Sequence, residues 1–285
     1  MLFFHYLSKH EQLLMKNIDK CGKIRYNIKE YMMDLLCAKG ATVLSAYYDN
    51  GADIVTRQFI LNENTPTVIS DTYKKIRTNI LSAMNEKGFP CIAVTSQNKN
   101  DGKTTTASNL AITLSMLEKR VLLIDADLRR PSLHSLFRLK NRSGLSTVLS
   151  GSSDIYSAIC PEVLRDFHVM PSGPVPDNPA DILGGANMER LIRMLYKYYD
   201  CVIIDTPPLC VANDALLFNN YTAGIVLVIR ENKSTYTDMK NALLTISLGK
   251  TNLIGAIKTH CSSVKDEAAD YRTVLNSTEE EDDEE

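Results

Sequence analysis

A stretch in the first half of the chain has the residue types that bind phosphate. It reads AVTSQNKNDGKTTTASNLA from Ala93 to Ala111 and contains Gly102, Lys103 and Thr104 in succession. The glycine lets the backbone approach a phosphate, the lysine supplies a positive charge, and the threonine hydroxyl can reach a Mg²⁺ ion. The usual pattern also has a glycine five residues before Gly102, where this chain has Gln97. Taken alone, the motif leaves a chance match open.

Two further segments carry acidic residues directly after apolar runs. Asp125 and Asp127 follow RVLLI, and Asp205 follows CVII. Open parallel sheets bind ligands at the carboxyl ends of their strands, so these side chains and the loop are expected to converge. Because Mg²⁺ prefers oxygen ligands and takes few from protein, Thr104, Asp125 and Asp205 are the candidate metal ligands. A single such aspartate is more often a helix cap, but two strand ends together with Gly-Lys-Thr favour a metal–phosphate site.

The surrounding elements indicate how these residues are positioned. Apolar runs without alternation predict strands at residues 91–96, 120–127, 200–208, 222–231 and 252–259. Helical periodicity predicts helices at 70–88, 103–119, 178–199, 211–221 and 234–249, the first with a Ser or Asp cap and a terminal glycine. Apolar runs separated by helices are typical of a buried parallel sheet. The predicted fold is α/β, a doubly wound, mainly parallel sheet of the P-loop NTPase type with helices on both faces.

The composition suits one sizeable globular domain with appendages. The 285 residues are 44% hydrophobic with a net charge of −2, and because Glu279–Glu285 are all acidic the rest of the chain is mildly basic. No stripe of arginine and lysine with interleaved aromatics is present, so nucleic acid is not an expected partner. We predict a helical extension of unknown role at 1–64, a P-loop domain at 65–262, and an acidic, disordered tail at 263–285.

The cysteines and the apolar runs indicate in which cellular compartment the chain is expected. Seven cysteines are scattered without a C-x-x-C pair, and we interpret them as buried, reduced core residues. No apolar run approaches the about 20 residues that span a bilayer. The first residues, MLFFHYL, are too short for a secretory signal. A cytoplasmic chain is therefore expected, with any membrane contact made through a partner.

The motifs together resemble those of the bacterial tyrosine kinases, the cytoplasmic autokinases that accompany capsular and exopolysaccharide export. The family pattern T-S-x-x-P-G-E-G-K-[ST] reads TSQNKNDGKT here, D-x-D-x-R reads DADLR, and D-x-P-P reads DTPP. The resemblance runs from about Thr65 to Thr259 and includes MPSGPVPDNPADIL. It implies an ATP-dependent protein-tyrosine kinase that uses ATP and Mg²⁺ and regulates polysaccharide synthesis or export, with residues 65–262 as its kinase-like domain.

For phosphoryl transfer, which depends mainly on positioning and charge, we assign roles to individual residues. The phosphates are assigned to the loop and helix start, which comprise Asn98, Lys99, Asn100, Asp101, Gly102, Lys103, Thr104 and Thr105. The candidate catalytic residues are Lys103, Asp125, Asp127 and Asp205. Asp125 is the candidate to accept a tyrosine proton or assist the metal, and Asp127 and Arg129 shape the same edge.

Two features of the nucleotide site depart from the family pattern. Its Pro-Gly pair is Lys99-Asn100 here, and asparagine tolerates the positive φ that such a loop needs. The family's asparagine that contacts adenine has no equivalent, and Thr259 or His260 stands in its place.

The resemblance also implies partners. The family has an oligomerisation motif, E-x-x-R-x-x-R, and DTYKKIR gives Asp71, Lys74 and Arg77 at the same spacing. These residues lie on one side of a helix, so they predict a subunit contact and a homo-oligomer, although a solvated charged face is the alternative. The family also implies a membrane-bound activator or adaptor of the polysaccharide co-polymerase type, which recruits the chain to the inner face of the plasma membrane.

The C-terminal tail is the largest departure. Where the family has a cluster of acceptor tyrosines, this chain has Tyr271 and then acidic residues. Tyr271 is one candidate phosphoacceptor; alternatively, the acidic run imitates a phosphorylated cluster or only aids solubility. Two other functions also remain open, a partition-type ATPase switch and a degenerate nucleotide-binding regulatory subunit.

Overall fold

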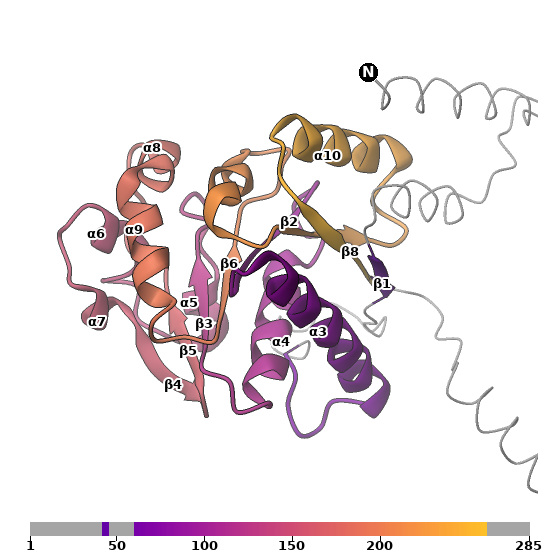
Figure 1. Ribbon diagram of the computed structural model, residues 1–285, viewed down its shortest axis with the longest axis horizontal. Helices are drawn as coiled ribbons and strands as arrows, with labels where there is room; N and C mark the ends of the chain where they lie inside the picture. The colour runs from indigo at the N-terminus through magenta and orange to yellow at the C-terminus, as the bar shows by residue number, and fades with distance from the viewer. Residues whose placement is uncertain (1–41, 46–59, 261–285) are drawn as a thin grey trace, which may run out of the picture.

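The computed structural model describes residues 42–45 and 60–260 of the chain. One eight-stranded sheet runs through it in the order β1-β8-β7-β2-β6-β3-β5-β4. Neighbouring strands are parallel except β4 and β5, which are antiparallel. Helices pack on both faces of the sheet (Figure 1). The predicted doubly wound, mainly parallel α/β fold is confirmed.

Strands and helices alternate along most of the chain. The strands are β1 (Thr42–Ser45), β2 (Cys91–Ser96), β3 (Val121–Asp125), β4 (Cys160–Leu164), β5 (Phe167–Met170), β6 (Cys201–Asp205), β7 (Ile225–Arg230) and β8 (Leu253–Thr259). The helices are α3 (Thr67–Lys87), α4 (Lys103–Ser115), α5 (Leu133–Phe137), α6 (Leu145–Leu149), α7 (Ile155–Ala158), α8 (Pro179–Gly184), α9 (Ala186–Leu195), the 3₁₀ helix η2 (Asp214–Tyr221) and α10 (Tyr236–Leu248).

The central strands are buried on both faces. Along β2, Cys91 and Ala93 belong to the core beneath α8, α9 and α10, whereas Ile92 and Val94 belong to the core beneath α3 and α4. All four side chains are fully buried. Because successive side chains of a strand point to opposite faces, a strand covered on both sides needs apolar residues throughout. This double burial explains the uninterrupted apolar runs in the sequence.

Helix α3 begins earlier than predicted. It starts at Thr67, after Pro66, whose carbonyl accepts hydrogen bonds from the backbone N–H groups of Ile69 and Ser70. The predicted Ser or Asp cap therefore lies within the helix and not at its start. A proline before the helix has a fixed φ and no N–H to satisfy, so it competes well with a side-chain cap. The predicted end is correct, since Gly88 adopts the left-handed conformation with φ 70°.

Other predicted boundaries and elements also differ from the structure. The helix predicted at 103–119 ends at Ser115, and the segment 211–221 forms the 3₁₀ helix η2 from residue 214. The helix predicted at 178–199 divides into α8 and α9 because Gly185 is extended, with φ −73° and ψ 157°. Strand β4 is absent from the sequence prediction, because its residues are partly or largely exposed at the sheet edge and give no apolar run.

The predicted division into three parts remains a prediction. β1 lies within the predicted extension, yet it pairs in parallel with β8 at the sheet edge. The helical part of the extension at residues 1–41, the acidic tail and Tyr271 lie outside the described residues. Across the residues that the structure describes, no helix combines the length and apolar character needed to cross a bilayer.

The cysteines are less uniform than expected. Cys91 and Cys201 are buried, as predicted, and both carry free thiols. Cys160 is half-buried and Cys210 is exposed, so the prediction of core cysteines is wrong for Cys210. Cys210 lies in the loop after β6, where the apolar run has ended.

Candidate functional site

The loop between β2 and α4 closes around a buried acidic residue. Asp101 Oδ2 accepts a hydrogen bond from the backbone N–H of Asn98 at 3.1 Å. The Asp101 carbonyl accepts one from the Thr259 hydroxyl at 2.8 Å. Asn100 and Gly102 have positive φ angles of 63° and 93°, which asparagine and glycine adopt more readily than other residues. The loop therefore closes without the Pro-Gly pair of the family pattern.

Lys103 and Thr104 begin α4 and contact acidic side chains. Lys103 Nζ lies 3.1 Å from Asp127 Oδ2 and 3.6 Å from Asp205 Oδ1, and the Thr104 hydroxyl donates to Asp205 Oδ2 at 2.6 Å. Burial lowers the pKa of Lys103, but the charges of Asp205 and Asp127 outweigh it, so the pKa lies above its ordinary value. A charged lysine at a helix N-terminus, where N–H groups are unpaired, favours an anion.

Asp125 has its carboxylate bound to backbone groups. Its Oδ2 accepts hydrogen bonds from the N–H groups of Ser132 and Leu133, both at 3.0 Å, and its Oδ1 accepts one from the N–H of Asp127 at 3.3 Å. These contacts hold the turn that leads into α5. Burial and the charge of Asp205 raise the pKa of Asp125, and the N–H donors oppose this rise. The contacts fit the role of a cap, which is the alternative that the sequence leaves open for a single strand-end aspartate.

Asp205 and Asp127 complete the acidic cluster. Asp205 is fully buried, and its Oδ1 accepts no hydrogen bond from any residue that the structure describes. Burial raises the pKa of Asp205, while the charge of Lys103 and the Thr104 hydrogen bond lower it. Asp127 reaches the adjoining cavity, where it pairs with Lys103. The sequence-predicted residues Lys103, Thr104, Asp125, Asp127 and Asp205 thus lie together, but with different surroundings.

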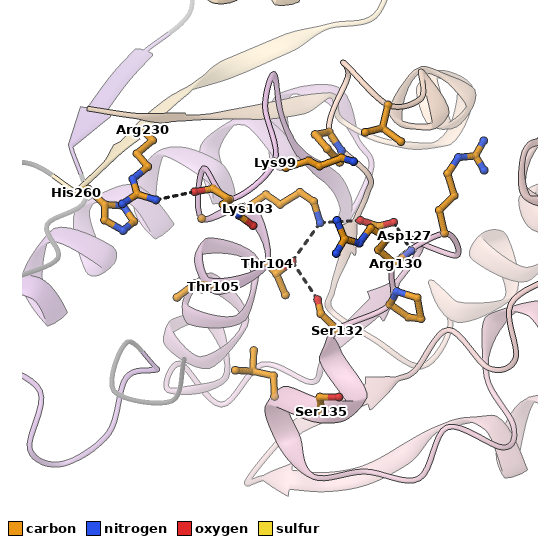
Figure 2. Close-up of a pocket in the computed structure, with 17 residues that line it drawn as sticks. Lys99, Lys103, Thr104, Thr105, Asp127, Arg130, Ser132, Ser135, Arg230 and His260 are labelled. Atoms are coloured by element: carbon orange, nitrogen blue, oxygen red, sulfur yellow. Dashed lines mark hydrogen bonds and ion pairs between the residues drawn. The ribbon is translucent and has the colours of Figure 1, made fainter. Parts of the chain in front are cut away.

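A cavity of about 1000 Å³ lies over the loop and this cluster (Figure 2). Its ionisable lining residues are Lys99, Lys103, Asp127, Arg129, Arg130, Arg230 and His260. Cationic side chains outnumber the one carboxylate, which suits a polyanion such as a triphosphate. Asp125 and Asp205 are not among the lining residues. Asp127 is therefore the carboxylate best placed to face a substrate in the cavity.

The donor set fits a Mg²⁺ ion with few protein ligands. Thr104 and Asp205 are in contact, and one buried oxygen of Asp205 lacks a hydrogen-bond donor among the described residues. Mg²⁺ commonly takes one or two carboxylates and keeps waters and phosphate oxygens for its other positions. No group of three His, Cys, Asp or Glu side chains gathers as a ready-made metal site within residues 60–260. Thr104 and Asp205 thus remain predicted ligands, whereas the oxygens of Asp125 are already bound to backbone N–H groups.

The two candidates for adenine recognition differ in position. The Thr259 hydroxyl donates to the Asp101 carbonyl, so this buried side chain holds the loop and does not face the cavity. His260 lines the cavity, and its Nδ1 lies 3.2 Å from Thr259 Oγ1. The geometry favours His260 over Thr259 as a group that faces a nucleotide, and the base contact itself remains a prediction.

Sequence reasoning did not identify the residues that hold the loop from the side of β7. Arg230 Nη1 donates to the Asn100 carbonyl at 3.1 Å, and Lys233 Nζ lies 3.3 Å from Asp101 Oδ1. The signal that could have found Arg230 is its position at the carboxyl end of an apolar run, the same signal that identified Asp125 and Asp205.

The predicted subunit contact lies on α3. Lys74 Nζ and Asp71 Oδ1 form an ion pair at 2.7 Å, and both side chains are exposed. Arg77 Nη1 donates to the Thr113 carbonyl at 2.5 Å, which joins α3 to α4. Two of the three residues thus face solvent, while Arg77 is bound within its own chain. Their role in assembly remains a prediction.

Comparison with known proteins places this site in a family. Residues 90–253 match the family model described as an AAA domain. The chain is 36% identical over 208 residues to tyrosine-protein kinase YwqD of Bacillus subtilis, which covers 73% of this chain and 88% of that protein.

Solved structures give the same result. The chimerical protein CapA2B2 superposes with a TM-score of 0.73 at 29% identity, covering 81% of this chain and 99% of that chain. The kinase domain of Escherichia coli tyrosine kinase ETK superposes with a TM-score of 0.70 at 28% identity, covering 80% of this chain and 95% of that chain.

Proposed function

The chain belongs to the bacterial tyrosine-protein kinases, and on this basis we propose that it transfers the γ-phosphoryl group of ATP to protein tyrosines. The observation that carries the proposal is the contact of Lys103 and Thr104 with Asp127 and Asp205 beside one basic cavity. Phosphoryl transfer depends mainly on positioning and charge neutralisation, and these residues supply both.

The nucleotide is assigned to the cavity over the loop. The N–H groups from Lys99 to Thr105 and the ammonium of Lys103 bind the phosphates in this proposal, since the N–H of Asn98 already donates to Asp101. Thr104 and Asp205 would hold Mg²⁺, directly or through water, and the ion would neutralise charge on the β- and γ-phosphates. Lys103 releases its pairing with Asp127 or shares it when the phosphates bind, because one ammonium can donate to several acceptors.

The acceptor tyrosine is assigned to the same cavity. Asp127 lines the cavity, whereas both oxygens of Asp125 are bound to backbone N–H groups. We therefore favour Asp127 over Asp125 as the group that accepts the tyrosine proton while the tyrosine oxygen bonds to phosphorus and ADP leaves. Asp125 instead positions the turn that carries Ser132.

The biological setting follows from family membership. We propose that the chain regulates capsular or extracellular polysaccharide synthesis, forms a homo-oligomer and is activated by a membrane-bound partner of the polysaccharide co-polymerase type. This partner would bring it to the inner face of the plasma membrane. Tyr271 is the proposed acceptor near the C-terminus, and autophosphorylation there would occur between subunits, alongside transfer to other protein substrates.

The test is incubation of the purified chain with Mg·ATP, followed by phosphosite mapping. Tyrosine phosphate is expected in the wild-type protein and absent after Lys103→Met, since the cation beside the phosphates is lost. Lys197→Met is the control, because Lys197 is an exposed lysine on the turn after α9 and should retain activity. Transfer by Lys103→Met at the wild-type rate, or ATP hydrolysis without tyrosine phosphate in the wild type, would overturn the proposal.

A further inference from the structure

The turn that follows β7 binds the phosphate loop through side-chain hydrogen bonds. Residues 230–234 leave the carboxyl end of β7 next to the loop between β2 and α4. Figure 2 shows Arg230 reaching one side of the loop, with Lys103 extending toward Asp127 on the other. Two cationic side chains of this turn, Arg230 and Lys233, therefore contact the loop that is expected to bind the phosphates.

Each cation binds a backbone carbonyl of the loop. Arg230 Nη1 donates to the carbonyl of Asn100 at 3.1 Å, and Lys233 Nζ donates to the carbonyl of Lys99. These two carbonyls belong to consecutive peptide groups. Hydrogen bonds from charged donors are stronger than those between neutral groups, so both peptide planes are held in one orientation.

The orientation of a carbonyl fixes that of its N–H partner. In a trans peptide the C=O and the following N–H point in opposite directions, and no cis peptide occurs among the described residues. The carbonyls of Lys99 and Asn100 point toward the two cations, so the N–H groups of Asn100 and Asp101 point away from them. Neither N–H donates to a backbone acceptor among the described residues, which leaves both for a phosphate.

Lys233 also joins this turn to the side chain of Asp101. Its Nζ lies 3.3 Å from Asp101 Oδ1, while Asp101 Oδ2 accepts hydrogen bonds from the Ser234 hydroxyl at 3.4 Å and the Asn98 N–H at 3.1 Å. The buried carboxylate is thus shared between the loop and the turn after β7. A displacement of Lys233 would release the Lys99 carbonyl and Oδ1 of Asp101, while Asp101 Oδ2 would keep its two donors.

We propose that Arg230 and Lys233 are positioning residues that pre-organise the phosphate loop, an inference that rests on the proposed nucleotide site. A proline at the position of Lys99 would fix φ there through its ring, whereas a lysine leaves more conformations open. The two cations supply the missing restraint through the carbonyls. They act on the nucleotide through the loop and raise affinity by reducing the ordering that binding requires.

The first test measures nucleotide affinity in matched variants. Arg230→Gln and Lys233→Met are expected to weaken Mg·ATP binding about ten-fold each, which corresponds to about 1.4 kcal/mol at 25 °C. Arg230→Lys and Lys233→Arg keep the charge and should recover most of the affinity, and Lys197→Met should have no effect. The rate at saturating ATP should change much less than KM, because the groups act through the loop. Dissociation constants equal to that of the wild type in folded Arg230→Gln and Lys233→Met would overturn the proposal.

A second test needs no nucleotide. Amide hydrogen exchange at residues 98–102 of the nucleotide-free chain should be faster in Lys233→Met and Arg230→Gln than in the wild type and in Lys197→Met. Unchanged exchange in both variants would contradict the restraint. If Lys233→Met does not fold, Arg230→Gln alone decides, because Arg230 lies at the cavity rim. A wild type that binds no Mg·ATP would refute the proposed kinase, while the exchange measurement would still test the restraint.

Discussion

Asp125 and Asp205 lie directly opposite each other on the neighbouring strands β3 and β6, yet their carboxylates serve different partners. Asp205 accepts the Thr104 hydroxyl at 2.6 Å, whereas Asp125 accepts the backbone N–H groups of Ser132 and Leu133 at 3.0 Å. Asp205 thus faces the phosphate loop, whereas Asp125 binds the turn that follows its own strand. Two aspartates at equivalent positions should therefore respond differently to the same substitution.

Asp205→Asn should remove the magnesium dependence of nucleotide binding. The amide can still accept the Thr104 hydrogen bond, but it no longer offers an anionic oxygen to the ion. The affinity for Mg·ATP is expected to fall at least about ten-fold, toward that for ATP without Mg²⁺. Isothermal titration with and without Mg²⁺ measures this, and an Asp205→Asn variant that keeps the full magnesium effect would exclude Asp205 as a ligand.

Asp125→Asn should reduce stability and leave the magnesium effect in place. An amide has one oxygen and an NH₂ group, so some of the N–H groups of Ser132, Leu133 and Asp127 would lose their acceptor in a buried site. The free energy of unfolding is expected to fall by about 1–3 kcal/mol, measured by urea denaturation. Loss of magnesium dependence with unchanged stability would instead assign Asp125 to the metal.

Asn100 should tolerate glycine but not valine. Its φ of 63° lies in the left-handed region, which costs a β-branched residue about 1–2 kcal/mol. Asn100→Gly is expected to bind Mg·ATP nearly as well as the wild type, and Asn100→Val about ten-fold more weakly. Equal dissociation constants for the two variants would show that the loop conformation does not control affinity.

The stability of the nucleotide-free chain should depend on His168 below neutral pH. Burial lowers the pKa of His168 below its ordinary value of 6.5, although the charges of Glu162 and Asp166 oppose this. The folded chain therefore binds this proton more weakly than the unfolded chain. The contribution of neutral His168 to the free energy of unfolding is therefore complete above pH 6.5, and it is lost as the pH falls below that value.

His168→Gln tests this pH dependence. Urea denaturation at about pH 7.5 and about pH 5.5 should show a smaller loss of stability in the variant than in the wild type, because glutamine does not titrate in this range. The His168 ring contacts the Tyr199 hydroxyl at 2.8 Å, so the variant's stability at the higher pH serves as its own reference. An identical loss in both proteins would show that His168 does not weaken the fold when it gains a proton.

The sequence by itself determined the class of fold and the residue types that gather at the site. Apolar runs such as Cys91–Ser96 predict strands covered on both faces, because that burial requires apolar side chains in succession. A parallel sheet gathers the carboxyl ends of its strands at one edge, so Asp125, Asp205 and the Lys103 loop could be placed together from their positions in the chain. Family motifs then identified the kind of protein, which the comparisons confirm.

Only the tertiary structure decided which groups each side chain meets. The Asp125 carboxylate binds N–H groups seven and eight residues away in the chain. Arg230 binds the carbonyl of Asn100, in the loop that follows the neighbouring strand β2. The sequence carries no local signal for such contacts, because a strand-end aspartate can turn toward its own loop or toward a neighbouring one. Packing selects between these directions, since a buried charge is stable only where donors surround it.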